Sequence, residues 1–67
     1  MEEGRSGRRI RAFRKLKRIQ QVEFAKRIGT SVTTLGRIER GEKTPTAEQL
    51  QKIANALDID IEELVGK

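Results

Sequence analysis

Residues 21–39 read QVEFAKRIGTSVTTLGRIE, and this stretch decides the expected fold. Its apolar pattern predicts two short helices, residues 21–28 and residues 32–40, joined by a tight turn. Gly29 falls at the turn, where a residue without a Cβ can adopt a positive φ at no steric cost. Ala25 is small enough to let a neighbouring helix approach closely. The stretch therefore predicts a steeply crossed helix pair whose second helix packs against the domain on one side only.

The segment before this pair has the pattern of an amphipathic helix over residues 8–18, with mostly basic residues between its apolar positions. Three apolar residues recur there at helical spacing: Ile10, Phe13 and Leu16. Residues 1–7, MEEGRSG, have no apolar periodicity, so we expect a flexible N-terminal arm. The predicted domain therefore covers residues 8–65.

The segment after the pair predicts two more helices. Gly41 ends the helix over residues 32–40, and Thr46 with Gln49 forms a capping box that begins the fourth helix. A fifth, short helix follows Asp60 and carries apolar residues at helical spacing. No segment alternates convincingly with a period of two. The predicted fold class is all-α, a compact bundle of five short helices.

Composition excludes several classes of function. The chain has 67 residues, with no Cys and no His, so the usual ligands of a metal site and the usual general base are missing. We therefore expect no metal, no cofactor, no small-molecule ligand and no enzymatic activity. No apolar run is long enough to cross a membrane or act as a signal peptide, so we expect a cytoplasmic protein.

The charge is distributed unevenly along the chain. Residues 1–43 carry 13 Lys or Arg against 5 Asp or Glu, whereas residues 44–67 carry 2 against 5. A basic half beside an acidic half is typical of a face that binds a polyanion such as nucleic acid. A basic but merely solvated surface explains the charges alone about equally well.

Five positions resemble a known family. Gln21, Ala25, Gly29, Glu39 and Gly41 match the pattern of the Cro/C1-type helix-turn-helix family, also called the xenobiotic-response-element or lambda-repressor-like type. The resemblance extends over about residues 8–65, because the flanking helices are similar as well. It implies a lambda-repressor-like DNA-binding domain whose third helix, about residues 32–40, enters the major groove.

The resemblance assigns candidates for base contacts on the third helix: Val32, Thr33 and Arg37. The Arg37 guanidinium can donate two hydrogen bonds to guanine, and the methyl groups of Val32 and Thr33 can pack on thymine. Each has a plainer alternative. Val32 could be a partly buried helix-start residue, Thr33 a solvated one, and Arg37 a solvated or phosphate-bound charge.

Contacts to phosphates are expected at Gln21, Ser31, Arg40 and Lys43. Gln21 begins the second helix, where free backbone N–H groups also point toward an anion. Ser31 is better placed as a helix cap, although its position allows both roles. Arg9 is a weaker candidate that is more simply read as a solvated charge. Such contacts position a protein on DNA and carry no direct sequence information.

Arg14 and Glu39 have a structural role in the resemblance. In the family the arginine of the first helix pairs with the glutamate that ends the third, so we expect a partly buried bidentate ion pair. The sequence departs from the family at Gly36, where a small polar residue is usual. It also departs at Asp58, where glycine is frequent, so the turn before the last helix could differ.

These observations favour a sequence-specific transcriptional regulator of double-stranded DNA, expected to repress. By the resemblance it binds a roughly palindromic site as a homodimer. The apolar residues near the C-terminus either form that dimer contact or close the core: Ile59, Ile61, Leu64 and Val65. The alternative is a protein-interaction module, such as an antitoxin-like or adaptor protein. The basic first half of the chain argues against that as the sole role.

Overall fold

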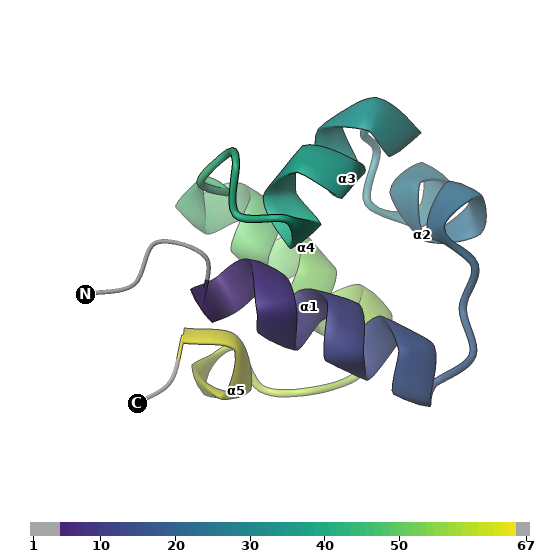
Figure 1. Cartoon of the computed structure of the whole chain (residues 1–67). Helices are drawn as coiled ribbons and strands as arrows, with labels where there is room; N and C mark the ends of the chain where they lie inside the picture. The colour runs from purple at the N-terminus through teal and green to yellow at the C-terminus, as the bar shows by residue number, and fades with distance from the viewer. Residues whose placement is uncertain (1–4, 66–67) are drawn as a thin grey trace.

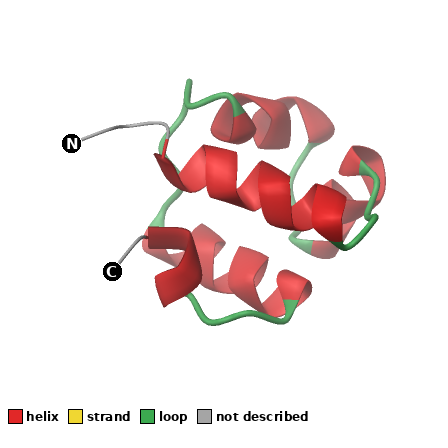
Figure 2. Cartoon of the chain, turned by 60° about the horizontal axis from the view of Figure 1, so that its bottom comes forward, coloured by secondary structure: helices red, strands yellow, loops and turns green. Residues whose placement is uncertain are grey.

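The computed structural model describes residues 5–65, and all regular secondary structure within that range is helical (Figures 1 and 2). The helices are α1 (Arg5–Leu16), α2 (Gln21–Arg27), α3 (Val32–Glu39), α4 (Ala47–Leu57) and α5 (Glu62–Val65). Helix α1 contacts α3, α4 and α5, while α2 packs on α3 (Figure 1). The predicted all-α bundle of five short helices is confirmed.

All five helices contribute to one hydrophobic core. The buried apolar residues are Ile10, Phe24, Ala25, Ile28, Leu35, Ile38, Ile53, Ala54, Leu57 and Leu64. Burying a large apolar side chain stabilises a fold by roughly 1.5–3 kcal/mol, so this cluster is the main source of stability. It lies on the inner side of α3, and this leaves the opposite side of that helix exposed.

Helix α1 begins at Arg5, three residues before the predicted start. Residues 5–7, expected to belong to a flexible arm, form the first turn of the helix, and residues 1–4 lie outside the described residues. Gly7 in this turn is buried against the end of α3. That tertiary contact explains why a turn with no apolar periodicity is ordered.

The prediction that Leu16 belongs to the apolar face of α1 is wrong, because its side chain is 74% exposed. Ile10 is fully buried and Arg14 is nearly so, and together they fix which side of α1 faces inward. At about 100° per residue, Leu16 points roughly 120° away from Ile10 around the helix. An arginine therefore occupies the inward position that the apolar pattern assigned to leucine.

The helix starts follow the capping expected from the sequence. The Ser31 hydroxyl accepts a hydrogen bond of 3.0 Å from the backbone N–H of Thr34 at the start of α3. At the start of α4, Thr46 and Gln49 form both hydrogen bonds of a capping box. Gln20 precedes α2 and forms no side-chain cap. Helices α3 and α4 therefore begin with a side-chain cap, whereas α2 does not.

Helices α1 to α4 all end in the same left-handed turn. In each case one residue has a positive φ, and the next backbone N–H bonds to the carbonyl five residues earlier. The four residues are Arg18, Gly29, Gly41 and Asp58, with φ between 60° and 82°. Asp58 thus adopts the geometry that a glycine would adopt. The expected difference in the turn before α5 is not found.

Candidate nucleic-acid interface

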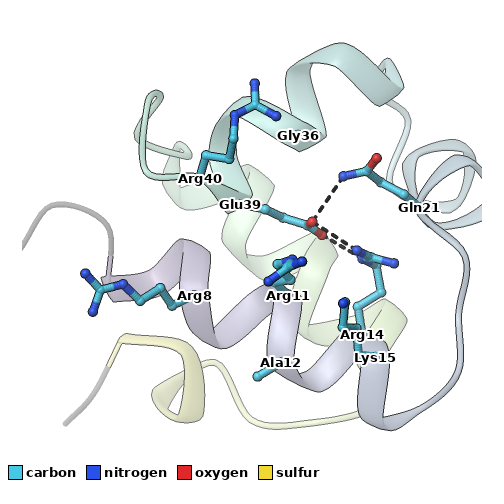
Figure 3. A pocket seen from close by; sticks show the side chains of 9 residues that line it. All are labelled: Arg8, Arg11, Ala12, Arg14, Lys15, Gln21, Gly36, Glu39 and Arg40. Carbon is cyan, nitrogen blue, oxygen red and sulfur yellow. Dashed lines mark hydrogen bonds and ion pairs between the residues drawn. The ribbon is translucent and has the colours of Figure 1, made fainter.

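Arg14 of α1 and Glu39 of α3 form a buried bidentate ion pair (Figure 3). The Arg14 Nε donates to Glu39 Oε2 over 2.7 Å, and its second guanidinium nitrogen donates to Oε1 over 3.1 Å. The remaining nitrogen of Arg14 donates to the backbone carbonyl of Ile19 over 2.9 Å. Each nitrogen of the guanidinium therefore donates one hydrogen bond. The pair joins the last turn of α1 to the end of α3.

Gln21 is the third member of this cluster. Its side-chain Nε2 donates to Glu39 Oε1 over 3.1 Å, so the first residue of α2 is tied to the last residue of α3. Sequence reasoning had assigned Gln21 only to a phosphate. The contact with Glu39 uses one N–H of the amide and leaves the carbonyl oxygen and the second N–H available. Gln21 can therefore hold the angle between the two helices and still face a ligand.

The three candidates for base contacts lie on α3 with exposed side chains. Val32 is 38% exposed, and both Thr33 and Arg37 are classed as exposed. Among the described residues, none of the three forms a side-chain hydrogen bond or an ion pair. Leu35 and Ile38 are buried on the other side of the helix. The helix therefore presents a polar face whose hydrogen-bonding groups are available to a partner.

Arg40 lies at the end of this face and pairs with Glu42. Its Nε donates to Glu42 Oε2 over 3.0 Å, and both side chains are more than half exposed. The hydrogen bond and the charge of Arg40 lower the pKa of Glu42, and the same interactions raise the pKa of Arg40. Lys43, the neighbouring phosphate candidate, is exposed in the following loop. The pairing of Arg40 with a carboxylate was not expected from the sequence.

The two remaining candidates, Ser31 and Arg9, both form hydrogen bonds within the fold. Ser31 caps α3, and its hydroxyl also lies 3.0 Å from the hydroxyl of Thr34. Arg9 donates to the backbone carbonyl of Glu63 over 3.1 Å, which ties α1 to α5 on a different side of α1. Arg9 is therefore a structural residue in this fold.

Glycines at two positions shape the interface. A Cβ at Gly7 would overlap the backbone carbonyl oxygen of Ile38, so only glycine permits this contact between α1 and α3. Gly36 is buried beneath Arg40, and a Cβ there would lie 3.1 Å from the end of the Arg40 side chain. The contact of Gly7 was not expected from the sequence. Its only signal was a glycine one residue before the basic helix predicted over residues 8–18.

Other kinds of site find no support among residues 5–65. No group of three or more acidic side chains in that range could hold a metal ion. None of the described helices is long and apolar enough to cross a membrane. The arrangement that remains is a surface helix with an exposed polar face, set at a fixed angle to a second helix. This geometry defines a helix-turn-helix domain.

Comparison with known proteins identifies the family. The helix-turn-helix family model HTH_3 matches residues 10–64, and the chain belongs to this family of Cro/C1-type DNA-binding domains. A relative of Bacillus subtilis strain 168, the uncharacterized HTH-type transcriptional regulator YazB, is 55% identical over 58 residues. That match covers 87% of this chain and 84% of YazB. The chain is accordingly a DNA-binding transcriptional regulator.

Two solved structures share the fold. The restriction-modification controller protein C.AhdI from Aeromonas hydrophila is 33% identical with a TM-score of 0.85, covering 90% of this chain and 91% of that protein. The P22 c2 repressor in complex with a synthetic operator is 36% identical with a TM-score of 0.82. The second match covers 88% of this chain and 89% of the repressor.

Proposed function

We propose that this chain is a transcriptional repressor that binds a roughly palindromic duplex as a homodimer, with α3 in the major groove. The observation that carries the proposal is the exposed face of α3, where neither Thr33 nor Arg37 has a side-chain hydrogen bond or an ion pair among the described residues. A single α-helix fits the major groove of B-DNA, and base edges there present a distinct pattern for each base pair. The similarity to a repressor bound to its operator supports the same mode of binding.

The side chains of this face have separate roles in the proposal. Arg37 donates two hydrogen bonds to a guanine, and such a pair discriminates against other bases by roughly 1–3 kcal/mol. Val32 and Thr33 pack on thymine methyl groups. Gln21, Ser31, Arg40 and Lys43 hold the phosphates on either side. The charge distribution agrees with this division, since the basic half of the chain supplies all of these residues.

The homodimer in this proposal forms through the C-terminal segment. Leu64 is fully buried and closes the core, so it is not available for a dimer contact. Val65 is 36% exposed, while Ile59 and Ile61 are half-buried at the edge of the core. A contact through these three residues would place two copies of α3 on one face of the DNA. Their half-sites would then lie about 34 Å apart, one turn of the double helix.

The test begins with selection of bound duplexes from a random library. We expect an enriched motif with two half-sites, and a stoichiometry of two chains per full site in sedimentation experiments. Arg37→Ala should weaken binding to that site by roughly 1–3 kcal/mol and relax the selected base at one position per half-site. Arg27→Ala is the matched control, because Arg27 lies at the end of α2 and pairs with Glu23.

Two results would contradict the proposal. A motif unchanged by Arg37→Ala would remove the base contact assigned to that residue. The absence of binding to any duplex, together with recovery of a stable complex with another protein, would favour the protein-interaction module.

A further inference from the structure

A basic groove runs between α1 and the second half of α3. It has a volume of about 870 Å³. Arg8, Arg11 and Lys15 line it from α1, and Gly36 and Arg40 line it from α3 (Figure 3). The groove is therefore a continuation of the exposed face of α3, since Arg40 belongs to both. None of the residues contributed by α1 was a candidate for DNA contact from the sequence.

The three cations of α1 form one stripe along the helix. Arg8, Arg11 and Lys15 are spaced by three and four residues, which places them on one side of an α-helix. All three are exposed, and within the described residues none forms an ion pair or a side-chain hydrogen bond. With a rise of about 1.5 Å per residue, the stripe is roughly 10 Å long. Ala12 lies between them and is too short to obstruct the groove.

The carboxylate that lines this groove does not neutralise the stripe. Glu39 receives two hydrogen bonds from Arg14 and one from Gln21, so both of its oxygens are already engaged. Like charges three or four residues apart on a helix repel each other and destabilise it. The free chain therefore carries a repulsion along α1 that a bound anion would relieve.

We propose that this stripe binds the sugar–phosphate backbone of the DNA beside the major groove that α3 enters. The inference rests on the proposed function and adds a second line of phosphate contacts from α1. The charges are spread over a length along which one DNA strand carries about three phosphates, since successive phosphates are about 3.4 Å apart along the axis. The stripe raises affinity for any duplex and does not select sequence, because it faces the backbone.

The test is the salt dependence of binding by the full chain. Arg8→Ala, Arg11→Ala and Lys15→Ala are made singly and together, and the dissociation constant for the selected duplex is measured between 0.05 and about 0.3 M salt. Each lost phosphate contact should reduce the log–log slope by about 0.9, and the triple variant by up to about 2.7. Binding to a random duplex should weaken by the same factor, so the ratio of the two affinities stays constant.

A triple variant with the same loss of charge serves as control. Lys17→Ala, Arg27→Ala and Lys52→Ala remove three cations that lie away from the groove, two of them already paired with glutamates. This control should retain the slope of the unmodified chain. Thermal unfolding of both triple variants checks that each remains folded, and loss of the repulsion along α1 should not lower the melting temperature of the stripe variant.

The outcomes separate the two proposals. Equal slopes for the stripe variant and the control, with sequence-specific binding retained, would overturn the phosphate line and leave the proposed function intact. A changed motif in the stripe variant would also overturn it, since a backbone contact does not select bases. Failure of the unmodified chain to bind any duplex would overturn both.

Discussion

Gly7 of α1 lies against the backbone carbonyl oxygen of Ile38 near the end of α3. The two helices meet there without an intervening side chain, because a Cβ at Gly7 would overlap this oxygen and approach the carbonyl of Glu39 to 3.1 Å. Both neighbours are backbone atoms, which cannot move aside without moving α3. The contact therefore helps to set the position of the DNA-facing helix relative to α1.

Gly7→Ala should destabilise the domain although it improves helix propensity. Overpacking costs typically about 1–3 kcal/mol, more than the 0.5–1 kcal/mol or so that alanine gains over glycine within a helix. In a domain of this size each 1 kcal/mol shifts the melting temperature by roughly 4–8 °C. Thermal unfolding measures the effect. Gly36→Ala is the control, because its Cβ would meet only the ends of side chains, Arg40 at 3.1 Å and Gln21 at 3.7 Å, and it should be neutral or stabilising.

Removal of both partners of the buried pair should cost less than the sum of the two single removals. Glu39→Ala leaves Arg14 buried without its counter-charge, and breaking such pairs typically costs about 3–5 kcal/mol. Arg14→Ala likewise leaves the Glu39 carboxylate buried without its counter-charge. The double variant should lose less than the sum of the two single variants. Urea unfolding of all four proteins gives the coupling energy, and additive losses would show that the two side chains act independently.

The left-handed helix ends predict two opposite effects of glycine. Asp58→Gly should raise stability by up to about 1 kcal/mol, because glycine adopts a positive φ without the steric cost of a Cβ. Gly29→Ala should lower stability by a similar amount, since its φ is 74° although no atom would touch the new Cβ. Asp58→Asn removes the charge but keeps the Cβ, so it separates the effect of the charge from the effect of the backbone conformation. If melting temperatures of Asp58→Gly and Asp58→Asn coincide, the gain comes from the removed charge.

The Arg40–Glu42 pair predicts that Glu42→Gln strengthens DNA binding at neutral pH. The carboxylate occupies the guanidinium of Arg40 and would repel a nearby phosphate. Arg40 lowers the pKa of Glu42 in the free protein, and bound DNA would raise it. Binding would then take up a proton. It would strengthen as the pH falls through the pKa of Glu42 in the complex. Titration of a fixed duplex with both proteins at several pH values tests this. An identical pH dependence in the variant would exclude Glu42 as the source.

Local signals in the sequence were sufficient for the number and order of the helices. The capping box at Thr46 and the glycine at position 29 act within a few residues, so their effects can be inferred without knowing the fold. Leu16 was misplaced because the inward position of α1 belongs to Arg14, whose partner lies 25 residues away. The role of Gly7 likewise depends on a helix that is remote in sequence. Contacts between distant elements decide both positions.

The candidate interface was predictable in part for the same reason. The exposure of Thr33 and Arg37 follows from the position of the apolar residues on α3. The hydrogen bond from Gln21 to Glu39 and the pairing of Arg40 with Glu42 depend on side-chain conformations that an apolar pattern does not contain. The groove between α1 and α3 requires the packing of two helices. The exposed side of α3 could therefore be predicted, whereas its supporting contacts could not.

The free face of α3 has a consequence for how proteins of this kind acquire new targets. Val32, Thr33 and Arg37 share no side-chain hydrogen bond with the rest of the described chain, and exposed substitutions of this sort usually change stability by less than about 0.5 kcal/mol. Mutation can therefore change the three proposed base-contact positions while the fold stays constant. Divergence of operator preference after gene duplication would need only a few codons, and no compensating change in the core.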